Sequence, residues 1–262
     1  MAEPSLIDWL RGVSALLNGC AREWELTIGE PYRMGAAGYV VRAERADGTP
    51  AVLKLGLPHR EGEHEADALE RWDGDGAVRL LERDDGRNAL LLERAEPGTF
   101  LSESPDALDV LIGLLPRLWK SGDGFHSLED EAALWIEHEL PRARHGDVAI
   151  GILRELAPTQ GEQVLLHQDL HGENVLAAER EPWLVIDPKP LAGEREFSVA
   201  PIVRSFELGH SRRQALYRLD RLTSELALDR ERARGWTIAQ TIAWSGGSDW
   251  IQTHMETVEW LL

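Results

Sequence analysis

The stretch HQDLHGEN, residues 167–174, is the most informative part of this chain. It fits the pattern His-x-Asp-x-x-x-x-Asn and lies between two short segments rich in strand-forming residues. The chain's frequencies of His, Asp and Asn predict only about 0.007 chance matches to that pattern. A second element follows at residues 183–187, where the strand-like sequence WLVID ends in Asp187, thirteen residues after Asn174. Together they place two carboxylates and one carboxamide close to the ends of short strands.

These residue types suit phosphoryl transfer to a hydroxyl group. That reaction needs a carboxylate to orient the attacking hydroxyl and accept its proton, and Mg²⁺ ions to bridge the nucleotide phosphates. Asp169 suits the first task. Because Mg²⁺ prefers hard oxygen ligands, the Asn174 amide oxygen and the Asp187 carboxylate suit the second. The alternative of a zinc pair, His167 with His171, is disfavoured because the two lie in a loop and no third ligand cluster accompanies them.

Residues farther upstream suit the binding of nucleotide phosphates. Gly35, Ala36, Ala37 and Gly38 form a turn of small residues between the first two expected strands. Backbone N–H groups in such a turn can approach phosphate oxygens closely. By itself this signal is weak, since β-hairpins often contain glycine.

Lys54 ends the next strand-like run, AVLK, and Glu65 follows eleven residues later on an expected helix. A lysine paired with such a glutamate is fixed against the α- and β-phosphates of a nucleotide. Glu61 and Glu63 are rivals for this pairing, and the helix register decides between them. The alternative for Lys54 is an ordinary surface charge. We expect Lys54→Ala to leave the fold intact, because an exposed lysine contributes little to packing.

The chain divides near residues 95–98, where AEPG forms a connector. Residues 1–95 predict an N-terminal nucleotide-binding lobe, a small antiparallel β-sheet with one helix, preceded by an N-terminal helix over 5–20. The expected strands cover residues 24–28, 39–44, 51–55, 78–83 and 89–93, and the helix covers 61–72. Residues 96–262 predict a larger, mainly helical catalytic and acceptor-binding lobe. Its expected helices lie at 106–120, 128–140, 147–157 and within 200–262, and its short strands at 164–166, 174–177 and 183–186. The predicted class is α+β.

Composition excludes several classes of protein. The net charge of −18 argues against nucleic acid or an anionic membrane as partner, and it is compatible with a cationic small molecule. One cysteine in 262 residues fits a reducing cytosol. The N-terminus lacks the basic start of a signal peptide, and the longest apolar stretch, 108–119, is too short to span a bilayer. We therefore expect a cytoplasmic protein without a membrane partner. Only three of the 28 basic residues are lysine: Lys54, Lys120 and Lys189.

With these residues assembled, the chain resembles the aminoglycoside phosphotransferases of the kinase-like superfamily. It is most similar to the branch that contains streptomycin 6-kinases and hydroxyurea phosphotransferases. This closer similarity is carried by WDGDGAVRLL at 72–81, LLLERAEPG at 90–98, the stretch 167–174, WLVIDPK at 183–189, and GE at 193–194. It covers roughly residues 30–200 and implies a bilobal protein-kinase-like fold with ATP and Mg²⁺ as cofactors.

The resemblance also implies a role for each matching residue. Asp169 becomes the catalytic base, and Asn174 and Asp187 become magnesium ligands. Lys54 and Glu65 become the ion pair that anchors the nucleotide.

Two further roles are assigned only by the resemblance. Backbone groups of Glu93 and Ala95 bind adenine at a hinge, and His167 holds the catalytic loop. The chain departs from the family pattern at Gln168 and Pro190, where glycine is usual, and at Ser198, where an acid is common. The last two put the identity of the acceptor in doubt rather than the activity.

These observations favour transfer of the γ-phosphoryl group of ATP to a hydroxyl of an aminoglycoside, with streptomycin as the expected acceptor and antibiotic inactivation as the result. Glu194 and Asp249 are candidate carboxylates for its guanidinium groups, and Trp244 is a candidate cation-binding face. Each of the three is otherwise an ordinary surface or core residue. The alternatives are a kinase for hydroxyurea or another hydroxylated metabolite, and a non-catalytic nucleotide-binding protein.

Absent motifs narrow the choice further. The chain has no Walker sequence and no G-x-S-x-G, so it resembles neither a P-loop NTPase nor an α/β-hydrolase. Asp187 is followed by Pro-Lys rather than Phe-Gly, and no A-P-E follows, so a protein substrate is disfavoured. The sequence does not predict the oligomeric state.

Overall fold

The computed structural model describes residues 6–32, 38–246 and 251–262. The chain divides into two compact units, which are described separately below. The first unit is Met1–Gly98 with Ala177–Ile186, and the second is Thr99–Leu176 with Asp187–Leu262. The units thus change at Gly98, three residues after the end of the predicted N-terminal lobe, and the first unit also takes in ten residues from the second half of the chain.

The first unit is built on a five-stranded sheet in the order β1-β2-β3-β5-β4, and every neighbouring pair is antiparallel. Its strands are β1 (Thr27–Pro31), β2 (Gly38–Glu44), β3 (Pro50–Gly56), β4 (Leu80–Asp84) and β5 (Ala89–Glu93). The helix α2 (Glu65–Trp72) separates β3 from β4. This confirms the small antiparallel sheet with one helix in the predicted chain order.

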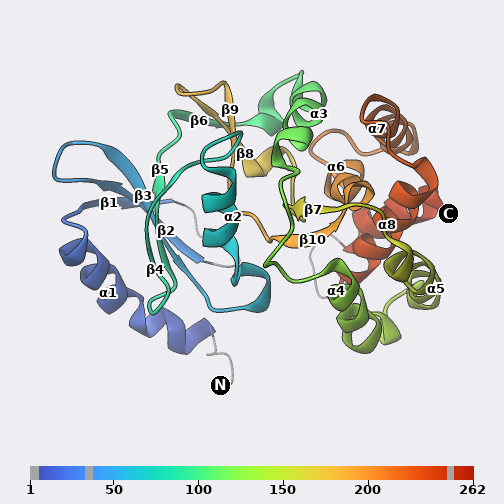
Figure 1. The fold of residues 1–262 in the computed structure, drawn as a ribbon, viewed down its shortest axis with the longest axis horizontal. Coiled ribbons are helices and arrows are strands. Elements are labelled where there is room, and N and C mark those ends of the chain that lie inside the picture. Colours follow the sequence, from blue (N-terminus) through green and yellow to red (C-terminus); the bar gives the residue numbers. More distant parts are fainter. Residues whose placement is uncertain (1–5, 33–37, 247–250) are drawn as a thin grey trace. The chain divides into compact units, whose positions relative to one another are not determined.

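One face of this sheet is covered by α1 (Leu6–Glu23), and α2 lies on the opposite face (Figure 1). Side chains alternate between the faces of a strand, so Leu53 and Leu55 of β3 point one way and Lys54 points the other. Both leucines are fully buried in a cluster with Trp9, Val13 and other residues of α1 and the sheet. Burial of each leucine contributes roughly 1.5–3 kcal/mol. That apolar face fixes the strand register and thereby turns Lys54 toward α2.

Two element boundaries differ from the prediction for local reasons. The first strand begins at Thr27 rather than residue 24, because Glu25 has a φ of 52°. This left-handed conformation is incompatible with an extended strand. The helix expected from residue 61 begins at Glu65, after a short 3₁₀ turn at Arg60–Gly62.

Within the first unit, the segment Ala177–Ile186 is held to the N-terminal residues by backbone and side-chain hydrogen bonds. Val78 N–H donates to the Val185 carbonyl at 3.0 Å, and Val185 N–H donates to the Gly76 carbonyl at 2.9 Å. Arg180 donates to both carboxylate oxygens of Glu93 at 2.7 and 2.9 Å, and to the carbonyl of Ala77 at 3.0 Å. These bonds hold residues distant in sequence beside the end of β5.

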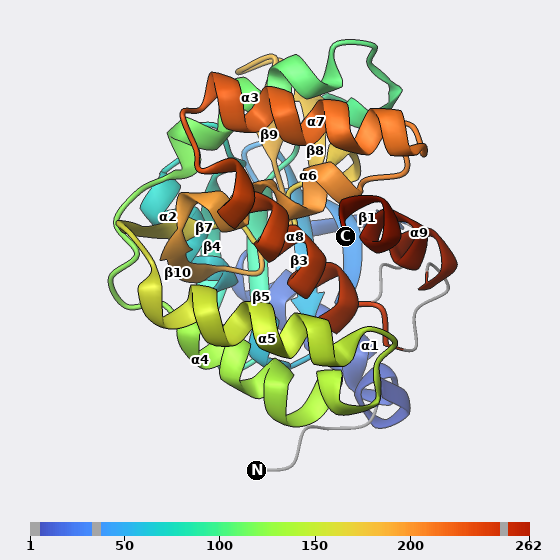
Figure 2. The ribbon, with the colours of Figure 1, turned by 90° about the vertical axis from the view of Figure 1, so that its right-hand side faces the viewer.

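The second unit is mainly helical. Its helices are α3 (Ala107–Leu118), α4 (Leu128–Leu134), α5 (Gly146–Leu156), α6 (Ala200–Arg204), α7 (Arg212–Glu225), α8 (Arg230–Ala243) and α9 (Ile251–Leu261). The buried helix α8 packs against α5, α6, α7 and α9 (Figure 2). The mainly helical character of this unit was predicted.

Short strands complete the fold. The pair β7 (Gln163–Leu166) and β10 (Leu191–Glu194) is antiparallel and belongs to the second unit. A three-stranded sheet has the order β6-β8-β9, with β6 (Pro97–Phe100), β8 (Val175–Ala178) and β9 (Trp183–Val185). The strands β6 and β10 were not predicted. The sequence of β6 begins with Pro97-Gly98, which is typical of a turn.

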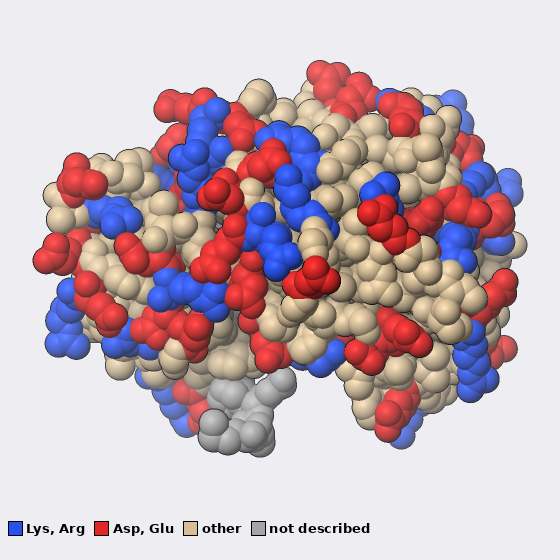
Figure 3. Space-filling view, viewed as in Figure 1, with Lys and Arg blue, Asp and Glu red and all other residues tan. Residues whose placement is uncertain are grey.

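The surface carries both signs of charge, and acidic and basic side chains alternate over the face in Figure 3. Among the described residues, no helix combines the length and the apolar character needed to cross a bilayer.

Candidate active site

The sequence 167–174 forms a loop that starts where β7 ends, in the second unit. His167 is 3% exposed, and its Nδ1 accepts a hydrogen bond from the Asp169 backbone N–H at 3.3 Å. The carbonyl of His167 accepts from the Lys189 N–H at 3.0 Å. The Asn174 side chain closes the loop, because its Nδ2 donates to the Asp169 carbonyl at 2.8 Å. The loop therefore presents Asp169 from a backbone held at both ends.

The Asp169 carboxylate faces three cationic or basic side chains. Lys189 Nζ lies 2.6 Å from Oδ2, Arg204 Nη2 lies 3.6 Å from Oδ1, and His171 Nε2 lies 4.0 Å from Oδ1. Burial raises the pKa of Asp169, but the charges of Lys189, His171 and Arg204 together outweigh it and hold the pKa below its usual value. Asp169 is therefore ionised at neutral pH.

Trp244 lies under two of these cations. The Lys189 ammonium is 5.0 Å from the centroid of the Trp244 ring, and the Arg204 guanidinium is 4.9 Å from it. Trp244 was expected to offer its face to a cation of the acceptor; the cations that the structure places over the ring are Lys189 and Arg204 of the chain itself.

Residues of α8 support the loop from behind. Gln240 Nε2 donates to the Gln168 carbonyl at 2.9 Å, and Gln240 Oε1 accepts from Arg204 Nη1 at 2.9 Å. Gln168 has a φ of 65°, a conformation that favours glycine. This explains in physical terms why glycine suits the position after the motif histidine. A non-glycine residue there costs about 1–2 kcal/mol, and Gln168 is held by the surrounding bonds.

Glu207 connects the 167–174 loop to the segment that follows α6. Its Oε1 lies 2.8 Å from His171 Nδ1 and accepts from the Gly172 N–H at 3.0 Å. Burial lowers the pKa of His171, but Glu207 and Asp169 raise it by more, so its pKa lies above the usual value. A Cβ at Gly172 would come within 2.9 Å of the Ser102 Cα, which explains the glycine at this position.

Arg218 in turn fixes the segment that carries Arg204 and Glu207. It is 3% exposed, and its guanidinium donates to the backbone carbonyls of Val203, Ser205, Leu208 and Gly209 at 2.8 to 3.3 Å. Burial lowers the pKa of Arg218 to about 10, against the opposing charge of Glu207. It remains protonated at neutral pH.

Four residues that contact or support Asp169 were not predicted from the sequence: Lys189, Arg204, Glu207 and Arg218. A weak signal existed only for Lys189, as one of three lysines in the motif WLVIDPK. The other three act on partners at least nine residues away, so no local spacing reveals them.

A cavity of about 650 Å³ opens beside Glu207 in the second unit. Its lining combines apolar surface with a few polar groups, which is typical of small-molecule pockets. The lining residues include Ser102, Pro105, Leu108, Glu207, Arg213 and Tyr217.

Asn174 and Asp187 also belong to the second unit and are half-buried. The bond from Asn174 Nδ2 to the Asp169 carbonyl occupies the amide nitrogen and leaves the amide oxygen as the atom that can act as a ligand. Asp187 has a φ of 56° at the turn that follows β9. An amide oxygen and a carboxylate are the hard donors that Mg²⁺ prefers, so these two residues fit the metal.

In the first unit, Lys54 and Glu65 form a buried ion pair. Lys54 Nζ donates to the two carboxylate oxygens of Glu65 at 2.6 and 2.7 Å, and the residues are 8% and 7% exposed. Of the three candidate acids, Glu65 is the one that the structure shows bonded to Lys54. The expectation that Lys54 is exposed is wrong. We therefore expect its loss to destabilise the fold, because it would deprive the buried Glu65 carboxylate of this cation.

Glu93 and Ala95, the residues expected to bind adenine, lie at the end of β5 and just after it. Glu93 ends β5, and its carboxylate accepts from Arg180 and from the Arg79 N–H at 3.0 Å. Burial raises the pKa of Glu93, but these bonds lower it by more. Ala95 is half-buried and lies between β5 and β6.

Part of the small-residue turn is not described. Gly38 is the first residue of β2, where a Cβ would lie 3.0 Å from the Leu55 carbonyl oxygen. Gly35, Ala36 and Ala37 lie outside the described residues, as does Asp249.

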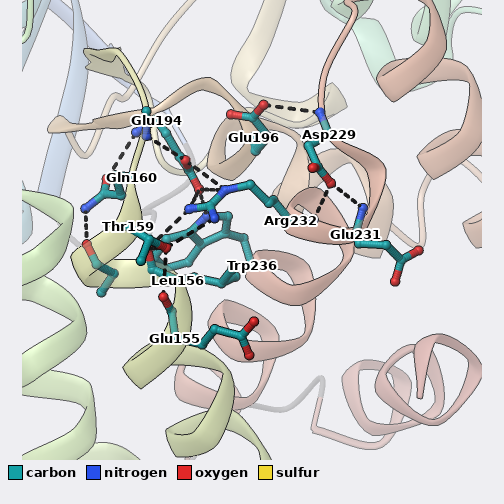
Figure 4. A network of polar contacts seen from close by, with 12 residues as sticks. Glu155, Leu156, Thr159, Gln160, Glu194, Glu196, Asp229, Glu231, Arg232 and Trp236 are labelled. Atoms are coloured by element: carbon teal, nitrogen blue, oxygen red, sulfur yellow. Dashed lines mark hydrogen bonds and ion pairs between the residues drawn. The ribbon is translucent and has the colours of Figure 1, made fainter.

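Glu194 requires a correction. It is 2% exposed, and its carboxylate accepts from both Arg232 Nε and Nη2, from the Trp236 indole N–H and from the Gly161 N–H (Figure 4). Its guanidinium partner is Arg232 of the chain itself, so the carboxylate is saturated. The expectation that Glu194 binds the acceptor does not hold, and the residue joins β10 to α8.

The chain matches known proteins over most of its length. Residues 24–249 match the family described as aminoglycoside/hydroxyurea antibiotic resistance kinase. The chain is 41% identical to a streptomycin 6-kinase of Streptomyces griseus, over 89% of this chain and 82% of that protein. It is 39% identical to a hydroxyurea phosphotransferase of Kitasatospora aureofaciens, over 90% of this chain and 73% of that protein.

Solved structures show the same fold. A choline kinase from Streptococcus pneumoniae is similar with a TM-score of 0.69 and 16% identity, covering 96% of this chain and 99% of that one. At this identity the similarity concerns the fold alone, which is α+β and kinase-like. The match over residues 24–249 and the relatives near 40% identity carry the assignment. The chain belongs to the aminoglycoside/hydroxyurea antibiotic resistance kinase family and is an ATP-dependent phosphotransferase.

Proposed function

We propose that this enzyme transfers the γ-phosphoryl group of ATP to a hydroxyl of a cationic aminoglycoside, with streptomycin as the first candidate. The observation that carries the proposal is the geometry of the 167–174 loop, which presents the ionised carboxylate of Asp169 and is closed by the bond from the Asn174 side chain to the Asp169 backbone. In the proposed reaction the acceptor oxygen forms a bond to phosphorus as the bond to the ADP oxygen breaks. The hydroxyl proton passes to Asp169.

Asp169 is suited to accept that proton late. Its low pKa makes it a weak base for an alcohol, but a loose transition state does not require early loss of the proton. Its contribution is then to orient the hydroxyl and to accept the proton as the phosphoryl group arrives.

The nucleotide and metal roles are part of the same proposal. Asn174 and Asp187 would hold Mg²⁺, which when bound neutralises charge on the phosphates. Lys54, fixed by Glu65, would bind the α- and β-phosphates. Backbone groups of Glu93 and Ala95 would bind adenine, and the turn that ends in Gly38 would approach the phosphates. Because ATP is the donor, we place the reaction in the cytoplasm.

The acceptor is proposed from the relatives and from charge. A relative at 41% identity is named a streptomycin 6-kinase, and the net charge of −18 favours a cationic ligand. The 650 Å³ cavity beside Glu207 is large enough to take part in binding such a molecule. Hydroxyurea is the second candidate, because a relative at 39% identity is named a hydroxyurea phosphotransferase.

The experiment is an acceptor panel with Mg²⁺ and ATP, read as the mass gain of one phosphoryl group on streptomycin, other aminoglycosides and hydroxyurea. We expect the gain on streptomycin. A gain confined to hydroxyurea would select the second candidate. Nucleotide binding without transfer to any acceptor would indicate a non-catalytic protein and contradict the proposal.

A further inference from the structure

We propose that Lys189 is a further catalytic residue, whose ammonium group contacts the phosphoryl oxygens during transfer while it orients Asp169. This inference rests on the proposed function. The chain contains only three lysines among 28 basic residues, and one of them, Lys189, forms an ion pair with the residue assigned as the base.

The contact between Lys189 and Asp169 is short and specific. Lys189 Nζ donates to Asp169 Oδ2 at 2.6 Å, while its backbone N–H is bonded to the His167 carbonyl at 3.0 Å. Both ends of the lysine are thus attached to the catalytic loop. Any hydroxyl that donates to the Asp169 carboxylate must lie within a few ångströms of this ammonium group.

Lys189 differs from the second cation at Asp169. The Arg204 side chain is 8% exposed, is bonded to Gln240 and lies farther away, at 3.6 Å. The Lys189 side chain is 20% exposed and shares the Trp244 face with Arg204. Arg204 is therefore a fixed background charge, whereas Lys189 retains access to a bound molecule.

A compact ammonium suits the proposed step. It has three donor hydrogens, and one of them reaches Asp169. During transfer, charge is spread over the three equatorial oxygens of the phosphoryl group. A second hydrogen of the ammonium can then donate to one of these oxygens while the acceptor proton moves to Asp169. Lys189 gains and loses no proton in this step. A planar guanidinium at the same place would be larger and oriented differently.

The competing interpretation is that Lys189 only positions Asp169. The two interpretations separate in a double-mutant cycle. If Lys189 acts solely through the Asp169 carboxylate, Lys189→Met causes no further loss of kcat in an Asp169→Asn background. If it contacts the phosphoryl group, a loss persists in that background.

The experiment measures kcat and both KM values for wild type, Lys189→Met, Lys189→Arg, Asp169→Asn and the double variant Asp169→Asn/Lys189→Met. We expect Lys189→Met to lower kcat by about 10²–10³-fold, as for loss of one donor to a developing anion, with little change in the KM for ATP. In the Asp169→Asn background we expect a loss of at least about tenfold. Lys189→Arg retains a positive charge beside Asp169, and its kcat is expected to lie between those of wild type and Lys189→Met.

Lys120→Met is the control for removal of a lysine from the second unit, and it is expected to leave kcat unchanged. Thermal unfolding of each variant checks that the fold is intact. Transfer by the wild-type chain to the acceptor panel tests the proposed function separately. Given that transfer, the proposal for Lys189 is overturned by a wild-type kcat in Lys189→Met, or by the absence of any further loss in the double variant.

Discussion

At the scale of single residues, the Lys54–Glu65 pair has the clearest consequence for stability. Both residues are buried, and the two bonds between them are 2.6 and 2.7 Å long. Removal of one partner of a buried ion pair costs roughly 3–5 kcal/mol, because the remaining charge is left uncompensated. Replacement of both partners by apolar residues is often neutral by comparison.

We therefore expect Lys54→Met to lower the free energy of unfolding by about 3 kcal/mol and to weaken ATP binding. The double variant Lys54→Met/Glu65→Met should recover most of the stability and none of the ATP binding. Urea unfolding and nucleotide titration measure the two effects. A single variant as stable as wild type, or a double variant that binds ATP normally, would contradict this account of the pair.

At the scale of elements, the site depends on α7, a helix that contributes no residue to the catalytic motif. Arg218 of α7 donates to four backbone carbonyls of the segment 203–209. That segment carries Arg204, which faces Asp169, and Glu207, which accepts a hydrogen bond from the 167–174 loop. Loss of the guanidinium leaves these carbonyls without their donor.

We expect Arg218→Met to lower the free energy of unfolding by about 3 kcal/mol, since each unsatisfied buried group costs about 1–3 kcal/mol and water can partly replace the donor. We also expect kcat to fall by at least about tenfold, because Arg204 and Glu207 lose their support. Arg212→Met, an exposed change at the start of the same helix, is the control and should alter neither quantity. Equal kcat values in the two variants would show that α7 does not support the site.

In α9, His254 is expected to make the stability of the fold depend on pH. Burial, helped by the charge of the nearby Arg204 and opposed by that of Asp169, lowers the pKa of His254 to about 4. Between about pH 6.5 and pH 4 the unfolded chain binds a proton at His254 that the folded chain does not, so stability falls as the pH falls through this range. The full effect is at most about 3 kcal/mol.

The test compares wild type with His254→Gln, which cannot titrate, in urea unfolding from pH 7 to pH 4. Protonation of carboxylates with a lowered pKa, such as Asp67 and Glu93, also destabilises the fold in acid. These carboxylates are present in both proteins, so their effect cancels in the comparison. We expect the difference in unfolding free energy between the two proteins to shift in favour of His254→Gln toward pH 4. A difference that does not change with pH would show that His254 is protonated equally in both states.

At the scale of the whole molecule, the sequence predicts what is local and misses what is distant. The alternation in β3 predicts the face on which Lys54 lies, and the spacing to the following helix limits its partner to Glu61, Glu63 or Glu65, because each element has a regular period. The structure, which begins α2 at Glu65, shows the bond to Glu65. Asp169, Asn174 and Asp187 lie within one short stretch, so their residue types and spacing could be recognised in the sequence, and their roles stay predictions. The kinase-like α+β class follows from these motifs and the change from β-rich to helical sequence.

The remainder depends on contacts between segments far apart in the chain. A glutamate such as Glu194 is expected from the sequence to lie on the surface. Only its contacts with Arg232 and Trp236 of α8 show that it is buried. Arg204 and Glu207 reach Asp169 and Gly172 across about 35 residues, so no sequence spacing brings them together. The short strands β6 and β10 were missed because hydrogen bonding to partners, rather than local propensity, defines them.

The central claim is that Asp169 orients the acceptor hydroxyl and takes its proton. The measurement is kcat for phosphorylation of streptomycin, or of the acceptor that the panel identifies, by Asp169→Asn, with ATP affinity determined in parallel. Glu173→Gln is the matched control, because Glu173 is an exposed carboxylate of the same loop. We predict a fall in kcat of about 10²–10⁴-fold for Asp169→Asn with ATP affinity nearly unchanged, and a wild-type rate for Glu173→Gln. A near wild-type rate in Asp169→Asn would contradict the account, and a loss in Glu173→Gln instead would assign the base to Glu173.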